Sequence, residues 1–109
     1  MPIGLEPLPD RFLRGREFLL LKKHFDVFTN SNTGTLVTAL DPDVVLLFGV
    51  ATDVCDDAAI RGLLQRGRSV RFVEDAARGL DEARVAACTA AWREAGVEFA
   101  TTDEVLASL

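Results

Sequence analysis

Hydrophobic residues in this chain are concentrated in short runs. The run DVVLLFGV at residues 43–50 has no polar alternation, which is typical of a strand covered on both faces of a parallel sheet. SVRFVED at 69–75 and VEFAT at 97–101 predict two further strands, and EFLLLK at 17–22 predicts another buried one. We therefore expect a sheet of four strands.

The stretches between these runs have the composition of helices and turns. TLVTAL at 35–40 predicts a brief helix after the turn-rich segment 24–34. A longer helix is expected from about Asp53 to Gln65, ending near Gly67, since glycine is the usual residue just past a helix end.

Two more helices are predicted from their caps. Asp81 is suited to cap the first of them, and Gly96 closes it. One side of this helix is formed by Val85, Cys88 or Thr89, Trp92 and Ala95. Thr101 and Glu104 form a capping box for the last helix, which ends at Leu109.

The alternation of strands and helices with short connections is typical of right-handed βαβ units. We therefore predict an α/β fold of three layers, α/β/α, with a parallel, Rossmann-like sheet. A length of 109 residues suits one domain, so residues 1–109 are expected to form a single one. Residues 1–16, which contain three of the four prolines, are expected to be an irregular lead-in.

Composition and charge narrow the range of partners. Hydrophobic residues make up 49% of the chain and charged residues 27%, as in globular proteins. The net charge of -5 argues against a nucleic-acid partner, and no apolar run approaches the roughly 20 residues of a membrane span. The N-terminus lacks the features of a signal peptide. We therefore expect a cytoplasmic setting in which both cysteines stay reduced.

The segment GVATDVC joins the most apolar strand to the helix that follows it. Ligands of open α/β sheets bind beyond the carboxyl ends of the strands, which is where Cys55 falls. Thr52 or Asp53 can cap this helix, and in its first turn the unpaired backbone N–H groups and the helix dipole stabilise a thiolate. The same N–H groups can stabilise the oxyanion formed when a carbonyl carbon is attacked. Cys55 is therefore a candidate nucleophile.

The alternative is a packing role for Cys55. Free cysteine is among the most buried residue types, so periodicity alone favours packing over catalysis. Asp56 and Asp57 also oppose the ionisation of a neighbouring thiol, and a nearby cation would be needed to offset them. Cys88 lies one turn before Trp92 on the same helix side, and we expect it to face the core.

The stretch from the cysteine strand onward resembles the isochorismatase-like hydrolases, which include isochorismatases, nicotinamidases and N-carbamoyl amidohydrolases. The family pattern is an apolar strand, G-V-x-T-x-x-C, a helix ending in R-G, a second apolar strand and E/V-D-A. The matching residues here are Gly49, Val50, Thr52, Cys55, Arg66, Gly67, 70–73, Asp75 and Ala76. The resemblance extends weakly to the C-terminus.

The resemblance also covers an upstream segment, where family members carry a lysine in a K-x-x-x-[SD]-x-F pattern. In LKKHFDVF, Lys22 stands six residues before Phe28, with Asp26 between them. The match implies that Lys22 is the catalytic lysine and that Lys23 is its neighbour. The alternative is that both are ordinary solvated lysines.

The family's chemistry implies a cysteine-dependent hydrolase of small amides or related substrates. Cys55 would attack the carbonyl carbon and form a thioester with loss of the amine, and Lys22 would hold the thiolate. The peptide between Val50 and Ala51 would be cis, and the amides of Ala51 and Cys55 would face the oxyanion. Neither a cofactor nor a metal is expected.

The sequence departs from the family at the third member of its Cys-Lys-Asp triad. The family's Asp ends an N-terminal strand of the A-L-L-V-I-D-M-Q type, and Asp10 has no such strand before it. The Asp-x-His metal site of nicotinamidases is also missing, and the only histidine, His24, stands alone. Without that strand the apolar sheet edges would lack partners. We therefore expect the C-terminal portion of the family fold, completed by a homo-oligomer or by a complementing chain.

Two functions remain open on these observations. One is the hydrolase, with substrate selection expected in the loop at 29–34. The other is a non-catalytic, truncated family member that acts as a structural or oligomerisation module. The missing triad Asp and the acidic residue directly after Cys55 favour this second function.

Overall fold

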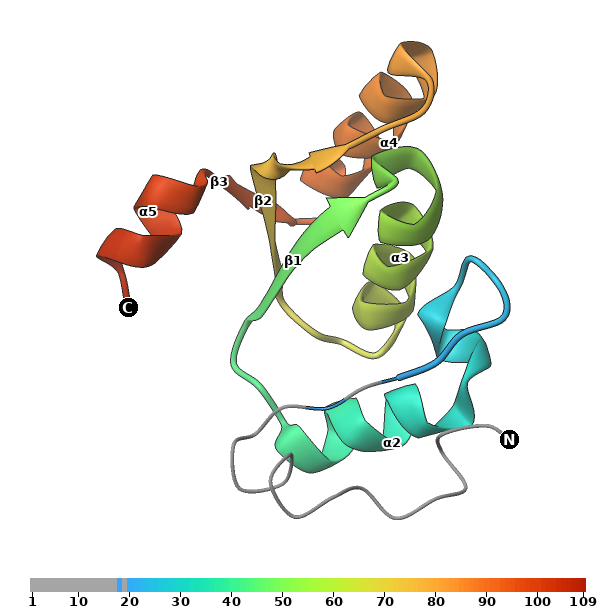
Figure 1. The fold of residues 1–109 in the computed structure, drawn as a ribbon. Helices are drawn as coiled ribbons and strands as arrows, with labels where there is room; N and C mark the ends of the chain where they lie inside the picture. Colours follow the sequence, from blue (N-terminus) through green and yellow to red (C-terminus); the bar gives the residue numbers. More distant parts are fainter. Residues whose placement is uncertain (1–17, 19) are drawn as a thin grey trace. The chain divides into compact units, whose positions relative to one another are not determined.

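The computed structural model describes Phe18 and residues 20–109 (Figure 1). The chain divides into two compact units, Met1–Asp41 and Pro42–Leu109, and each is described by itself. Within the described residues, none of the helices combines the length and the hydropathy that a membrane span needs.

The described part of the first unit consists of a short 3-10 helix, η2 (Val27–Thr29), and the helix α2 (Ser31–Leu40). This helix starts four residues before the predicted segment 35–40. The reason is a cap, because the side chain of Asn30 accepts the N–H of Asn32 at 2.9 Å. Residues 30–34 are of types that favour turns, but here Asn30 caps α2 and residues 31–34 form its first turn.

Two further predictions for the first unit are wrong. The loop expected at 29–34 is instead the end of η2, the cap and the first turn of α2. The strand expected at 17–22 does not form at Phe18 or at residues 20–22, while Glu17 and Leu19 lie outside the described residues. A strand needs neighbours for its backbone groups, and among the described residues the sheet contains strands of the second unit only.

The second unit contains a sheet of three parallel strands in the order β1-β2-β3. These strands are β1 (Val45–Val50), β2 (Val70–Arg78) and β3 (Glu98–Ala100). β2 continues three residues beyond the predicted end, and the register between β1 and β2 shifts between Leu47 and Gly49. The parallel sheet of the prediction is confirmed.

Helices follow each strand. A single π-helical turn, η3 (Thr52–Asp56), leads from β1 into α3 (Asp57–Gln65), α4 (Glu82–Glu94) connects β2 to β3, and α5 (Thr102–Ala107) ends the unit. Right-handed crossovers along a strand order that never reverses bring successive helices to the same face. Accordingly, α3 and α4 lie together on one side of the sheet and α5 lies toward the other (Figure 1). The α/β fold with helices flanking the sheet is confirmed.

The helix ends of the second unit follow from local side-chain chemistry. Asp81 caps α4 by accepting the N–H of Arg84 at 2.9 Å, and Thr101 and Glu104 form the predicted capping box of α5. Gly67 follows α3 with a φ of +73°, a conformation that glycine adopts without a steric penalty. These local predictions are confirmed, whereas the predicted end of the last helix at Leu109 is wrong, because α5 ends at Ala107.

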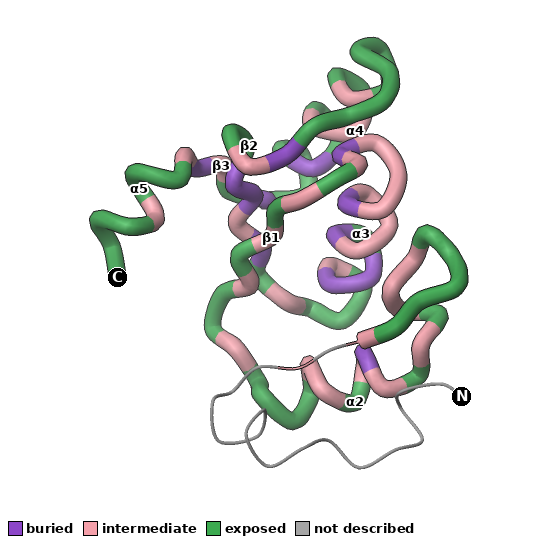
Figure 2. Tube along the Cα trace, viewed as in Figure 1, coloured by how far each residue is buried: buried purple, intermediate pink, exposed green. Residues whose placement is uncertain are grey.

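The core of the second unit lies between the sheet and the helices α3 and α4, where the buried residues gather (Figure 2). The ring of Phe72 on β2 meets the ring of Trp92 edge to face, with centroids 5.0 Å apart, and that of Phe99 at 5.8 Å. Ile60 of α3 is also fully buried. On the predicted inner side of α4, Trp92 is buried, whereas Ala95 at its end is exposed.

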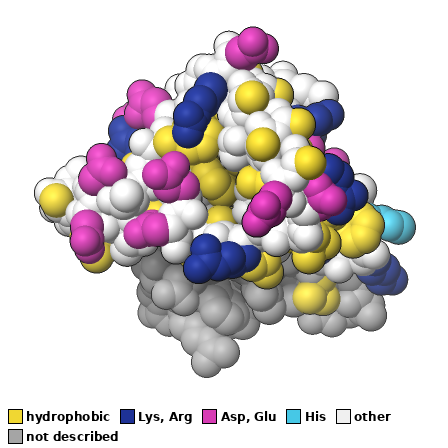
Figure 3. All heavy atoms as spheres, turned by 90° about the horizontal axis from the view of Figure 1, so that it is seen from above, with side chains coloured by type: hydrophobic (Ala, Val, Ile, Leu, Met, Phe, Trp, Pro, Cys, Tyr) yellow, Lys and Arg dark blue, Asp and Glu magenta, His cyan; other side chains and the backbone are white. Residues whose placement is uncertain are grey.

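The opposite side of β1 is exposed. Alternate residues Leu46, Phe48 and Val50, which we call the β1 outer row, have 37%, 63% and 70% of their surface exposed. Within the described residues, the prediction of a strand covered on both faces is therefore wrong for β1, because one face of this strand is left uncovered. Exposed hydrophobic side chains among acidic and basic ones are also visible in the view from above (Figure 3).

Candidate active site

Cys55 lies where β1 passes into α3, beyond the carboxyl end of the strand. It is the fourth residue of η3, in which the carbonyl of Ala51 accepts the N–H of Val54 at 3.1 Å and that of Asp56 at 3.0 Å. Wide turns of this kind occur frequently at functional sites. The residue is half-buried and is not part of a disulfide. The cysteine turn therefore has the position that ligand sites take in parallel sheets.

The backbone entering this turn has two special conformations. The peptide bond between Val50 and Ala51 is cis, as the family resemblance implied, and Gly49 before it has a φ of +119°. A side chain at Gly49 would be strained at this φ, which explains glycine at this point of the motif. The role of Ala51 and Cys55 as oxyanion donors stays a prediction.

The carboxylate of Asp53 does not cap the helix, and neither does Thr52, so that prediction is wrong. Instead, Asp53 Oδ1 accepts the N–H of Leu80 at 2.9 Å, and Oδ2 accepts the N–H of Asp81 at 3.2 Å. The guanidinium of Arg84 lies 3.2 Å from the same Oδ2. The hydrogen bond from Leu80 is the main reason that the pKa of Asp53 lies below its ordinary value.

Asp57 is directed at the neighbouring helix. Its Oδ1 accepts the indole N–H of Trp92 at 2.9 Å, and its Oδ2 lies 3.0 Å from Nε of Arg61. Asp57, the first residue of α3, therefore links this helix to α4. The other acidic neighbour, Asp56, is buried.

Cys88 on α4 lies close to the carboxylate of Asp57. Burial raises the pKa of its thiol, and the charge and hydrogen bond of Asp57 add to this effect. A thiol held protonated in this way is a poor nucleophile. Cys88 therefore fits the structural role that its helix side predicts.

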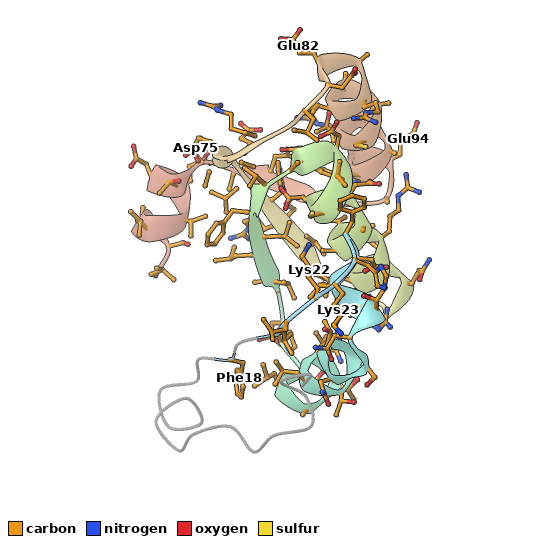
Figure 4. All side chains as sticks on the ribbon, turned by 45° about the vertical axis from the view of Figure 1, so that its right-hand side comes forward. Phe18, Lys22, Lys23, Asp75, Glu82 and Glu94 are labelled. Carbon is orange, nitrogen blue, oxygen red and sulfur yellow. The ribbon has the colours of Figure 1, made fainter. Side chains whose placement is uncertain are left out.

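Lys22 belongs to the first unit and Cys55 to the second, so their pairing stays a prediction. Within its own unit, Nζ of Lys22 donates to the carbonyls of Phe25 at 3.2 Å and His24 at 3.4 Å. Lys22 and Lys23 follow one another on the segment before α2 (Figure 4). The described part of the chain holds no group of three His, Cys, Asp or Glu residues that could bind a metal ion, and Asp10 lies outside it.

Asp75 is a motif residue for which the sequence predicted no role. Its Oδ1 accepts the backbone N–H of Thr102 at 2.8 Å and the hydroxyl of the same residue at 2.9 Å. Asp75 therefore fixes the start of α5 to β2 (Figure 4). The partner is 27 residues away, and no local pattern could have indicated it.

The fold and the site define a class, namely α/β proteins that present a cysteine at the carboxyl edge of a parallel sheet. The model of the isochorismatase domain matches residues 5–104. The chain therefore belongs to the isochorismatase family, as its motif predicts.

Known relatives agree with this assignment. The chain is 31% identical over 113 residues to isochorismatase domain-containing protein 2 of Danio rerio, covering 99% of this chain and 55% of that protein. The pyrazinamidase/nicotinamidase of Streptococcus mutans UA159 has a similar structure, with a TM-score of 0.74 and 20% identity over 84% of this chain and 51% of that one. An isochorismatase-like hydrolase of Alkaliphilus metalliredigens also has a similar structure, with a TM-score of 0.74 and 19% identity. This match covers 97% of this chain and 54% of that one. The chain thus spans about half the length of these relatives.

Proposed function

We propose that this chain is the nucleophile-bearing part of a hydrolase of small amides or related substrates, with Cys55 as the nucleophile. The observation that carries the proposal is the position of Cys55 in a wide turn between β1 and α3, beyond the carboxyl end of a parallel strand. Membership of the isochorismatase family supports it, as does the likeness to a nicotinamidase. These comparisons do not favour the non-catalytic module.

The proposed reaction has two steps. The thiolate of Cys55 attacks the carbonyl carbon, the oxyanion lies against the backbone N–H groups of Ala51 and Cys55, and the C–N bond breaks. The thiol has released its proton to solvent, and the leaving amine takes up a proton from solvent. Water then cleaves the thioester, which yields the carboxylic acid and restores the thiol. In this proposal Lys22 is the cation that stabilises the thiolate.

We propose that an assembly completes the site, because one face of β1 is left uncovered within the described residues. The β1 outer row supports a homo-oligomer in which a second copy covers Phe48 and its neighbours. Completion by a different, complementing chain is the alternative. A reduced, cytoplasmic setting would keep the thiol of Cys55 available.

The test is ammonia release from a panel of small amides that includes nicotinamide, combined with intact-mass detection of an acyl adduct. We expect turnover and an adduct on the peptide that contains Cys55, and we expect both to disappear in Cys55→Ala. Cys88→Ala is the matched control and keeps both. Equal turnover in Cys55→Ala, or no adduct with any amide at concentrations where the chain is oligomeric, would overturn the proposal.

A further inference from the structure

The loop formed by Gly79, Leu80 and Asp81, called here the 79–81 loop, joins the carboxyl end of β2 to α4. It lies at the same edge of the sheet as the cysteine turn, and Asp53 ties the two together. One carboxylate oxygen of Asp53 accepts the N–H of Leu80 at 2.9 Å, and the other accepts that of Asp81 at 3.2 Å. Asp53 precedes Cys55 by only two residues.

The chemistry of this contact requires a carboxylate. The side chain of Asp53 has no solvent-exposed surface, and its two oxygens receive two backbone N–H groups and the guanidinium of Arg84. An ionised carboxyl accepts on both oxygens, whereas the amide of asparagine accepts on one only. With both oxygens engaged in this way, the carboxylate of Asp53 holds the loop to the cysteine turn.

The loop itself is packed without spare room. A Cβ atom added at Gly79 would overlap Cγ2 of Val85 and lie 3.2 Å from Oδ1 of Asp53. The loop backbone therefore lies directly between α4 and the Asp53 carboxylate. This observation is independent of the hydrogen bonds, and it indicates that the loop is held from two sides.

The residue whose backbone Asp53 holds most closely has an exposed apolar side chain. Leu80 has 74% of its surface exposed, although its N–H is fixed to Asp53. A large apolar side chain on a fixed backbone, at the edge of the sheet where Cys55 lies, is suited to contact a bound substrate.

We propose that Leu80 forms an apolar wall of the substrate site and that Asp53 is the positioning residue that holds it there. This inference rests on the proposed function of Cys55. It deepens that function by specifying small amides that carry an apolar substituent, which the side chain of Leu80 contacts. Leu80 is then a specificity-determining residue, and Asp53 acts through it.

The first arm of the test uses hydrogen exchange and does not need catalysis. In Asp53→Ala the amides of Leu80 and Asp81 lose their acceptor, and we expect them to exchange at least about tenfold faster. The amides inside α4 keep their wild-type rates. Asp103→Ala, which removes an exposed acidic side chain from α5, is the matched control and leaves all of these amides unchanged. Unchanged exchange at Leu80 and Asp81 in Asp53→Ala would overturn the positioning role.

The second arm measures alkylation of Cys55 by iodoacetamide and by an N-benzyl haloacetamide in a Cys88→Ala background. We expect Leu80→Ala to lower the ratio of the two rates about tenfold by slowing only the benzyl reagent. Because Leu80 is exposed, this variant keeps the fold even if Asp53→Ala does not. An unchanged ratio in Leu80→Ala would overturn the specificity role. If Cys55 reacts with neither reagent, the proposed function fails, while the exchange arm still decides the role of Asp53.

Discussion

The two faces of the sheet in the second unit differ in what covers them. On the inner face, Phe72 packs against Trp92 and Phe99 beneath α3 and α4. On the outer face, β1 exposes Phe48 and Val50 by 63% and 70%. Both faces belong to strands that are apolar in sequence. An uninterrupted apolar run therefore indicates a strand whose two faces both pack against other elements. Within the described residues, only the inner face of β1 is covered in this way.

The largest effect is expected on the inner face. Trp92→Ala removes the ring that contacts Phe72 and leaves Asp57 without the indole donor. We expect the free energy of unfolding to fall by roughly 3–5 kcal/mol, as measured by urea denaturation. A loss under about 1 kcal/mol would show that the aromatic cluster does not hold the two layers together.

On the outer face, Phe48→Glu is expected to change assembly and not stability. The free energy of unfolding of the separated chain should shift by no more than about 0.5 kcal/mol, since Phe48 has few neighbours to lose. Sedimentation velocity should show the wild type as an oligomer and the variant as a smaller species. A wild-type chain that sediments as a single stable monomer would contradict the assembly proposed above.

The smallest effect concerns the pH dependence of stability at the cysteine turn. The N–H of Leu80 holds the pKa of Asp53 below its ordinary value of 3.8. A carboxyl with a lowered pKa in the folded state stabilises the fold above its unfolded pKa, and this contribution is lost as the pH falls through the folded value. The melting temperatures of the wild type and Asp53→Asn should therefore differ most above about pH 4. They should converge below it, and parallel curves across pH 2–6 would exclude this linkage.

The sequence predicted best those features that depend on near neighbours along the chain. The caps at Asp81 and Thr101, the inner side of α4 around Trp92 and the position of Cys55 after an apolar strand all depend on contacts within a few residues. The cap at Asn30 is also local, but its residue types favour turns and helix starts equally, so the beginning of α2 was misplaced.

The remaining features depend on partners far away in the chain. The contacts of Asp53 with Leu80 and of Asp75 with Thr102 each span 27 residues, and no periodicity predicts them. The same reason explains the wrong strand at 17–22, because an apolar run becomes a strand only beside another strand. The pairing of Lys22 with Cys55 has this long-range character too, and it stays a prediction.

The central claim, that Cys55 is the nucleophile of the proposed hydrolase, is tested most directly by its rate of alkylation with iodoacetamide at neutral pH. In the Cys88→Ala variant the alkylation rate is that of Cys55, and in the Cys55→Ala variant it is that of Cys88. The raised pKa of Cys88 makes its reaction slow at neutral pH. We predict that Cys55 in the Cys88→Ala variant reacts at least about tenfold faster than Cys88 does in the Cys55→Ala variant. Equal rates at the two cysteines, or a slower reaction at Cys55, would contradict the account.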